Sequence, residues 1–331
     1  MYTDRVQLLK VIEQRRKSRA ILYVTGDRPG LETQIHQEVY DYFVNLLDDI
    51  GLIDRISLVL YTRGGSTLAG WSIVNLIQQF CKTFEVIVPS KAHSAGTLMS
   101  LGAKYIVMTK QATLGPIDPS VNTALNPAVP GGPPDARVPV SVEAVNGFIE
   151  LGRSSIGFPA GRAIKELLIQ LSNQIHPLVL GEVFRSRSQI EMLGSRLLQS
   201  SGIKRRKIRP IISFLCSESG SHDYSIHRRE ARRLGLPVET PDETFYREIK
   251  AVYDDFSTEL ALTDRWNPVA VLAQQPLHHY AIKRCLIEST TGGSYYFLTE
   301  GDLRRIQVPN QPPQIQDTRI FEGWKYERAP R

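Results

Sequence analysis

The sequence has few cysteines and no long apolar run. Its 331 residues include three cysteines, and none of them forms a CxxC pair. An odd, sparse set argues against disulfides and zinc sites and is typical of a reducing compartment. No stretch approaches the roughly 18 apolar residues that a membrane-spanning helix needs. Residues 1–19 mix charges into an amphipathic pattern without a continuous apolar core, so we expect no signal peptide and predict a cytoplasmic protein.

The chain also lacks a strong charge of one sign. It holds 40 basic and 34 acidic residues, a net charge of +6. The basic clusters at 15–17, 204–207 and 227–233 are separate and carry no interleaved aromatic residues, so we interpret them as solvated faces and do not expect nucleic-acid binding. No GxGxxG fingerprint follows a strand, so nothing indicates a dinucleotide. We expect neither a metal nor a cofactor.

The most informative motifs of the sequence lie in two short turns. The β-branched apolar runs 56–61 and 84–88 each lead through a turn into a helical pattern, as in α/β enzymes. The first turn, 62–66, contains Gly64 and Gly65, which let the backbone bend sharply and leave amide hydrogens pointing outward. Such amides form one half of an oxyanion hole.

Ser94 lies in the second turn, residues 91–97, among small neighbours and ahead of a helix. Amide groups and the dipole at a helix start favour developing negative charge, which suits a nucleophile. The simpler interpretation is that Ser94 only caps the helix. The unit closes at residues 113–119, where prolines flank Asp118.

These motifs carry a family resemblance over about residues 20–120. The paired glycines, Ser-Ala-Gly at 94–96 and Leu-Gly-Pro-Ile-Asp-Pro at 114–119 resemble the Clp-protease/crotonase superfamily. They are most similar to the serine dehydrogenase proteinase family, a branch near the bacterial signal peptide peptidases. The resemblance implies an α/β spiral of ββα units and assembly into rings or other homo-oligomers. It also implies a serine peptidase with Ser94 as nucleophile, and the amides of Gly65 and Ala95, beside Gly64, as the oxyanion hole.

The general base stays open at this point. Asp118 stands where a Clp peptidase has its histidine, and a carboxylate is an inefficient base for a serine hydroxyl at neutral pH. His222 follows Ser221 and precedes Asp223, so an imidazole with an orienting carboxylate is available, although a surface histidine is the alternative. The other candidates are Lys91 and His93 near Ser94, Lys165 on a later helix, or a residue of another subunit.

The remaining elements follow from periodicity and turn signals. We predict a strand at 20–25, a connector or short strand at 207–216, a hairpin over 280–298 and an extended arm at the end. Residues 120–139, rich in Pro and Gly, are expected to lack regular structure, as a mobile flap or a disordered insertion. A helix of about 15 residues is predicted after the glycine turn. The other predicted helices are 4–17, with Val6, Leu9, Val11 and Ile12 on one face, 33–49, 97–103, 142–151, 162–174, 180–199, 228–234 and 242–260.

These elements suggest four parts. We expect an N-terminal helix at 1–19, a catalytic core at 20–140, a helical covering or oligomerisation segment at 141–265, and a small C-terminal hairpin and arm at 266–331. The function expected is hydrolysis of a peptide or protein substrate, ATP-independent by itself. The alternatives are a crotonase-like acyl-CoA enzyme, which uses the same amides without a serine, and an inert assembly or binding module.

Overall fold

The structure is a computed structural model, and it describes residues 1–117, 120–121, 123–155, 161–218, 223–307 and 313–329. The chain divides into two compact units: residues 1–114 with 225–331 form unit 1, and residues 115–224 form unit 2. These limits differ from the boundaries expected at 140 and 265. The difference arises because residues 226–259 pair and pack with the N-terminal elements, which no local pattern shows.

Unit 1 is built on an eight-stranded sheet in the order β10-β5-β3-β2-β1-β11-β12-β13. The first five strands are parallel and the last three are antiparallel. The parallel strands are β1 (Arg19–Thr25), β2 (Ile53–Tyr61), β3 (Cys81–Val88), β5 (Tyr105–Met108) and β10 (Val238–Glu239). The antiparallel strands are β11 (Leu277–Ser289), β12 (Gly293–Ile306) and β13 (Gln314–Glu327).

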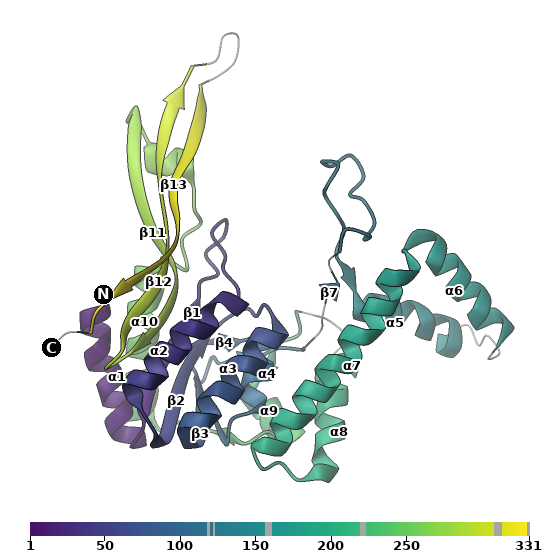
Figure 1. Cartoon of the computed structure of the whole chain (residues 1–331), viewed down its shortest axis with the longest axis horizontal. Helices are drawn as coiled ribbons and strands as arrows, with labels where there is room; N and C mark the ends of the chain where they lie inside the picture. The colour runs from purple at the N-terminus through teal and green to yellow at the C-terminus, as the bar shows by residue number, and fades with distance from the viewer. Residues whose placement is uncertain (118–119, 122, 156–160, 219–222, 308–312, 330–331) are drawn as a thin grey trace. The chain divides into compact units, whose positions relative to one another are not determined.

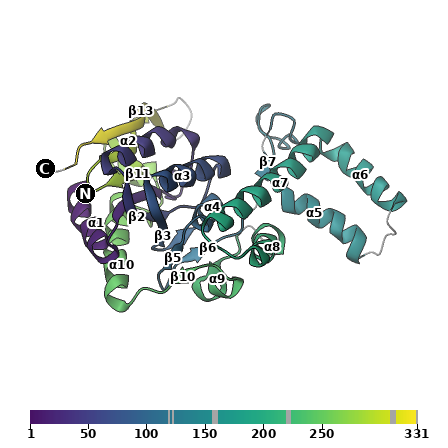
Figure 2. The same cartoon turned by 60° about the horizontal axis from the view of Figure 1, so that its bottom comes forward.

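Helices cover both faces of this sheet (Figures 1 and 2). On one face α1 (Tyr2–Arg16) and α10 (Glu243–Glu259) pack against alternate strand residues such as Leu22, Val59 and Val107 in one buried cluster. On the other face the Tyr23 ring meets Phe43 of α2 (Tyr40–Ile50) edge to face, with 5.3 Å between the ring centroids. Next to α2 come α3 (Thr67–Phe80) and α4 (Ala95–Leu101). Strands that are apolar on both faces are typical of such a buried parallel sheet.

A second, three-stranded sheet lies in the same unit, in the order β4-β6-β9. Its strands are β4 (Lys91–Ala92), β6 (Thr113–Leu114) and β9 (Ile226–His227), and α9 (Arg228–Leu234) follows the last. Thr62 bridges to Ala92 at the end of β2. A long strand, a short strand in the small sheet and a helix therefore recur along the chain, and the predicted α/β fold of ββα units is confirmed.

Unit 2 is mostly helical. Its helices are α5 (Val142–Glu150), α6 (Arg162–Gln174), α7 (Pro177–Ser200) and α8 (Arg205–Ser213), with π-helical turns at Leu151–Ser155 and Phe214–Glu218. Before them β7 (Ser120–Val121) pairs with β8 (Val140–Ser141). In the intervening loop the Asn126 side chain donates to the carbonyls of Val121 and Val138. These bonds hold the ends of the loop together, so the described part of it is ordered by hydrogen bonds instead of regular structure.

Three element predictions were wrong. Residues 207–216 are helical, because Ile208, Ile211 and Ile212 share one buried face that outweighs the cost of Pro210. The helix expected from 33 begins at Tyr40, after a 3-10 turn at Gln37–Val39, because the backbone of Ile35 pairs with Gly64 and Ser66. Val11 lies outside the buried face of α1, at 39% exposure.

The C-terminal region is larger than the predicted hairpin and arm. The hairpin forms, but its strands run from 277 to 306, and residues 314–327 form a third long strand instead of an arm. Leu272 of α11 (Pro268–Leu272), Tyr280 and Leu303 form a separate small core for this extension. Within the described residues, no helix is long and apolar enough to cross a membrane.

Candidate active site

Ser94 lies in a strained turn between β4 and α4. Its backbone angles are φ 50° and ψ −116°, in the left-handed half of the map that residues with a Cβ seldom occupy. Holding such a conformation typically costs about 1–3 kcal/mol and is found at functional turns, including the strand-to-helix elbow of hydrolases. Ser94 precedes α4 without capping it through its side chain. The capping role therefore does not account for this serine.

The surrounding backbone holds the turn in place. The amide of Gly96 donates to the His93 carbonyl at 2.8 Å, and the amide of Leu98 donates to the Ser94 carbonyl at 3.0 Å. The Thr97 hydroxyl, fully buried, donates to the Ala92 carbonyl at 2.8 Å. Three bonds thus offset the strain at Ser94 and fix where its side chain points.

The glycine turn packs directly against Ser94. Gly64 and Gly65 have φ values of 120° and 138°, which glycine adopts readily. A Cβ added to Gly64 would lie 2.7 Å from Ser94 Cβ and 3.1 Å from Ser94 Oγ. A Cβ added to Gly65 would lie 2.4 Å from the Ile35 carbonyl oxygen. Both positions therefore require glycine, Gly64 because of the serine and Gly65 because of the segment around Ile35.

Thr62 connects the two turns, and the sequence analysis did not single it out. Its hydroxyl accepts from the Gly64 amide at 2.9 Å and from the Thr25 hydroxyl at 2.6 Å. Its backbone amide donates to the Lys91 carbonyl, and its carbonyl accepts from the His93 amide, both at 3.1 Å. The sequence feature that could have identified Thr62 is its position between the end of β2 and the glycine pair.

The backbone amides of Gly64, Gly65 and Ala95 differ in whether they already have a hydrogen-bond partner. The Gly64 amide is bonded to Thr62, and the Gly64 carbonyl accepts from Ile35 at 2.8 Å. Among the described residues, the amides of Gly65 and Ala95 have no hydrogen-bond partner. Gly65 is partly exposed, whereas Ala95 is buried. Backbone amides without a partner are the kind of donor that an oxyanion hole uses.

Lys91 is engaged elsewhere. Its Nζ lies 2.8 Å from Asp27 Oδ2, and the Tyr61 hydroxyl donates to Asp27 Oδ1 at 2.8 Å. Burial, together with the charge of Asp27 and this hydrogen bond, raises the pKa of Tyr61 far above its usual value, so the phenol stays protonated. Asp27, at the end of β1, was another residue that the sequence analysis did not identify.

The other candidates for the general base lie in different parts of the chain. His93 Nε2 lies 2.8 Å from the Thr113 hydroxyl. Lys165 is exposed on α6, in unit 2. His222 and Asp118 lie outside the described residues. The residues that the structure brings together at Ser94 are therefore Gly64, with Gly65 beside it, and Ala95.

Comparisons with known proteins agree with the sequence motifs. Two uncharacterized proteins of Methanocaldococcus jannaschii are similar to this chain. MJ0137 is 28% identical over 195 residues, which are 57% of this chain and 56% of that protein. MJ1495 is 30% identical over 125 residues, which are 35% of this chain and 42% of that protein. The matched segment thus spans about half the length of these relatives.

Solved protease structures also match, at low identity. A mutant of the 1510-N membrane-bound stomatin-specific protease matches with 18% identity and a TM-score of 0.40, over 70% of this chain and 85% of that one. ClpP1 from Listeria monocytogenes matches with 16% identity and a TM-score of 0.36, over 71% of this chain and 98% of that one.

The N-terminal segment has the most specific match. Residues 1–130 match the family of ClpP-like SDH-type serine proteinases. This segment contains the glycine turn, Thr62, Ser94 and Ala95. The resemblance drawn from the motifs is thereby confirmed over residues 1–130, which are similar to the ClpP-like SDH-type serine proteinases.

Proposed function

We propose that the chain hydrolyses peptide bonds through an acyl-enzyme at Ser94. The observation that carries the proposal is the packing of the glycine turn against the strained serine, where a Cβ at Gly64 would fall 3.1 Å from Ser94 Oγ. The family match over residues 1–130 supports a serine peptidase at the level of the family.

The proposed reaction has two steps. Ser94 Oγ attacks the scissile carbonyl carbon while a base takes its proton, and the amides of Gly65 and Ala95 bind the oxyanion of the tetrahedral intermediate. The intermediate collapses to a Ser94 ester as the base returns the proton to the leaving amine. Water then attacks the ester and releases the acid product and free Ser94. Loss of one oxyanion donor typically costs about 3 kcal/mol in the transition state.

For the base, we propose His222 with Asp118 as its orienting carboxylate. The support comes from chemistry and sequence: an imidazole is an efficient base near neutral pH. Lys91 and His93 already contact Asp27 and Thr113. We expect His222→Ala to lower the rate of peptide hydrolysis by at least about a hundredfold. Lys165→Ala is the matched control and should keep the rate.

A mixing experiment tests whether the base comes from another subunit. Ser94→Ala and His222→Ala chains are each inactive in this proposal. If the base acts across subunits, mixed oligomers of the two regain activity, and if it acts within one chain they stay inactive. An unchanged rate in His222→Ala alone would remove His222 as the base.

The nucleophile is tested with a fluorophosphonate probe. We expect covalent labelling at Ser94, found by mass spectrometry of the digested protein, and none in Ser94→Ala. Hydrolysis that persists in Ser94→Ala would refute the mechanism. Stabilisation by coenzyme A without labelling would favour the acyl-CoA enzyme instead.

We further propose a peptide or protein substrate and a homo-oligomer, without a requirement for ATP in hydrolysis itself. The three cysteines are free, which suits a reducing compartment such as the cytoplasm. Analytical ultracentrifugation measures the assembly, and a monomer that hydrolyses peptides at full rate would contradict it.

A further inference from the structure

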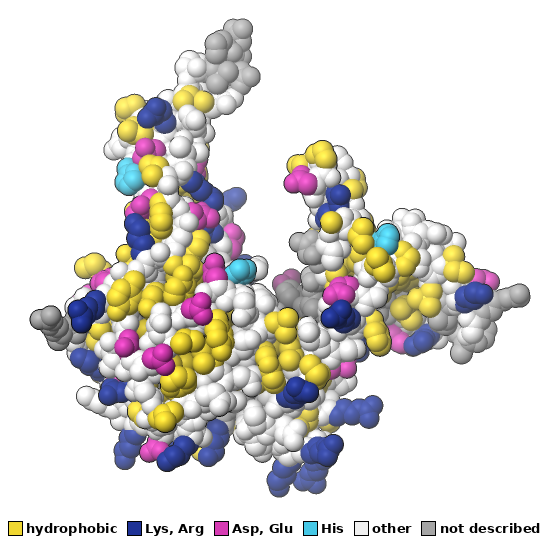
Figure 3. Space-filling model, viewed as in Figure 1, with side chains coloured by type: hydrophobic (Ala, Val, Ile, Leu, Met, Phe, Trp, Pro, Cys, Tyr) yellow, Lys and Arg dark blue, Asp and Glu magenta, His cyan; other side chains and the backbone are white. Residues whose placement is uncertain are grey.

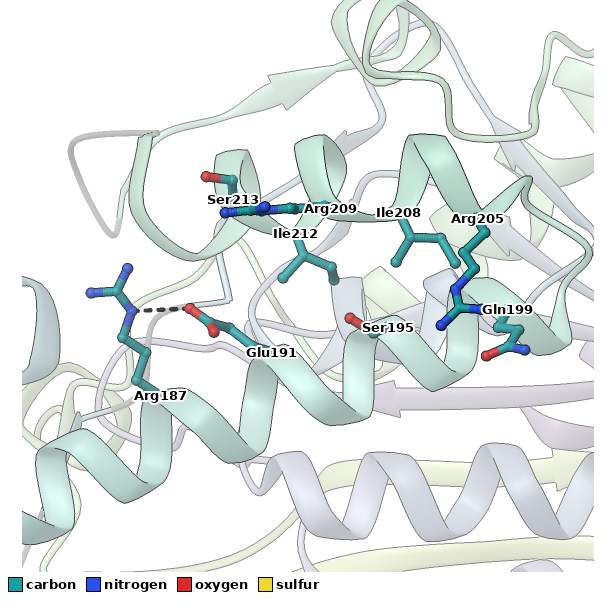
Figure 4. A pocket seen from close by; sticks show the side chains of 9 residues that line it. All are labelled: Arg187, Glu191, Ser195, Gln199, Arg205, Ile208, Arg209, Ile212 and Ser213. Carbon is teal, nitrogen blue, oxygen red and sulfur yellow. Dashed lines mark hydrogen bonds and ion pairs between the residues drawn. The ribbon is translucent and has the colours of Figure 1, made fainter.

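A polar cavity lies between α7 and α8, within unit 2. Its volume is about 560 Å³. On α7 its lining residues recur every four positions, at Arg187, Glu191, Ser195 and Gln199, and so lie along one helix face. From α8, Arg205, Ile208 and Ile212 point toward this face (Figure 4). The cavity is therefore built by two helices whose spacing the fold determines.

Apolar packing keeps this cavity in shape. Ile208 and Ile212 of α8 line it and are only 8% and 5% exposed. These two buried isoleucines form an apolar wall of the cavity beside its polar groups.

The charge of the cavity is unbalanced. Three guanidinium groups line it, from Arg187, Arg205 and Arg209, against the single carboxylate of Glu191. Glu191 is held by Arg187, whose Nε donates to Glu191 Oε1 at 3.0 Å. In the part of the chain that the structure describes, Arg205 and Arg209 make no hydrogen bond or ion pair. Figure 3 shows Lys and Arg side chains gathered on the surface around α8, at the lower edge of the view.

Several arginines elsewhere in the protein are paired with carboxylates. Arg16, for example, binds the carboxylates of both Glu85 and Glu239. Free guanidinium groups at the mouth of a polar cavity favour an anion with several oxygen atoms, because each planar fork can bind two of them. Ser195 and Gln199 add neutral hydrogen-bond donors.

We propose that this cavity binds a chain of phosphate groups, such as pyrophosphate or tripolyphosphate. A cavity of about 560 Å³ is larger than one phosphate needs, and binding sites for small molecules commonly measure about 300–1,000 Å³. Among the residues that the structure describes, no aromatic side chain lines the cavity, so none of them is available to stack a nucleobase. The ligand class is therefore the polyphosphate group itself, and the site does not depend on the peptidase proposed at Ser94.

The test is calorimetric titration of the full chain with inorganic tripolyphosphate. The double variant Arg205→Gln with Arg209→Gln should weaken binding by at least about tenfold. The matched control is Arg206→Gln with Lys207→Gln, which removes the same charge from the same helix at two exposed residues outside the cavity. We expect it to weaken binding by less than about threefold.

A second variant distinguishes binding inside the cavity from diffuse electrostatic attraction of tripolyphosphate to the protein surface. Ser195→Leu fills the space without changing charge and should also weaken binding by about tenfold, whereas Ser94→Ala should leave binding unchanged. Circular dichroism verifies that each variant is folded. The proposal is overturned if the parent chain does not bind tripolyphosphate, if both double variants lose affinity equally, or if folded Ser195→Leu binds like the parent.

Discussion

At the scale of single residues, the strained backbone of Ser94 is the feature that best identifies the candidate active site. Its backbone φ is 50°. Glycine adopts this conformation without strain, whereas the Cβ of a serine is crowded there. The chain nevertheless has serine there, and the hydroxyl does not cap α4. A strained position that retains a side chain indicates that the side chain has a role, which is consistent with a nucleophile.

Stability measurements test this strain separately from activity. We expect Ser94→Gly to be more stable than Ser94→Ala by about 1 kcal/mol, because glycine relieves the positive φ. Urea denaturation of both variants measures the difference. Ser100→Gly and Ser100→Ala, inside α4, are the control pair, and there the order should reverse. The same order at both sites would contradict strain at Ser94.

The glycine turn gives a second prediction at this scale. Gly64→Ala places a Cβ 2.7 Å from Ser94 Cβ, so it should slow fluorophosphonate labelling of Ser94 by at least about tenfold. Gly51→Ala is a matched control: its φ is also positive, at 71°, but nothing lies within 4 Å of the added Cβ. Gly51→Ala should lower the free energy of unfolding, but its Ser94 should be labelled at the same rate as in the parent chain. Equal labelling rates of the two variants would contradict a contact between Gly64 and Ser94.

At the scale of elements, a buried ion cluster ties α1 to α10 and β11. Arg5 is fully buried, and its Nε lies 2.7 Å from Glu288 Oε2 and its Nη1 2.7 Å from Glu259 Oε2, with Asp255 also bonded. Removing one partner leaves buried charges uncompensated. We expect Arg5→Met to lower the free energy of unfolding by about 3–5 kcal/mol. Arg15→Met, on the same helix but in a partly exposed ion pair, should cost much less, and equal losses would contradict a buried network.

The same cluster predicts a dependence on pH. Burial opposes ionisation of Glu259, but the charge of Arg5 and hydrogen bonds from Lys283 and Arg5 outweigh it and lower the pKa of this carboxyl. Because the pKa is lower in the folded state, the stabilisation is present above the ordinary value of 4.5 and is lost as pH falls through the folded value. The stability difference between the parent and Glu259→Gln should therefore be largest near neutral pH and narrow on acidification. A constant difference would contradict the assignment.

Element types could largely be predicted from the sequence. The helices at 162–174 and 228–234 form as predicted, and Gly51 ends α2 with a positive φ, because spacing and caps are local signals. Residues 207–216 were missed because a proline and several charges obscured three isoleucines on one face. Residues 314–327 were missed because their strand depends on β12, a distant partner.

At the scale of the whole chain, unit 2 is inserted between two paired strands of unit 1. Leu114 of β6 is directly opposite Ile226 of β9, and Thr113 is opposite His227. The residues on either side of the insertion are thus antiparallel neighbours, about 5 Å apart. A short turn can therefore connect them.

This geometry predicts that unit 1 folds without unit 2. Replacing residues 115–225 by Asn-Gly, a favoured hairpin turn, should leave a folded protein with a cooperative thermal transition. It should not hydrolyse peptides, because Asp118 and His222 are removed. The control combines the same replacement with Leu114→Pro. Proline removes a backbone amide from the strand, so this variant should be less stable. An unfolded product with Asn-Gly would show that unit 2 is required for folding.

The sequence by itself determined the element types around the two turns, the glycines and the serine in them, and the family resemblance of residues 1–130. Those features depend on residues close together in the chain, whose spacing and backbone preferences act locally. The tertiary structure alone decided that Thr62 joins the turns, that β11 pairs with β1 and that Arg5 is buried against Glu288. These contacts join residues far apart in sequence, and no local pattern specifies which distant partner a strand or a charge will meet.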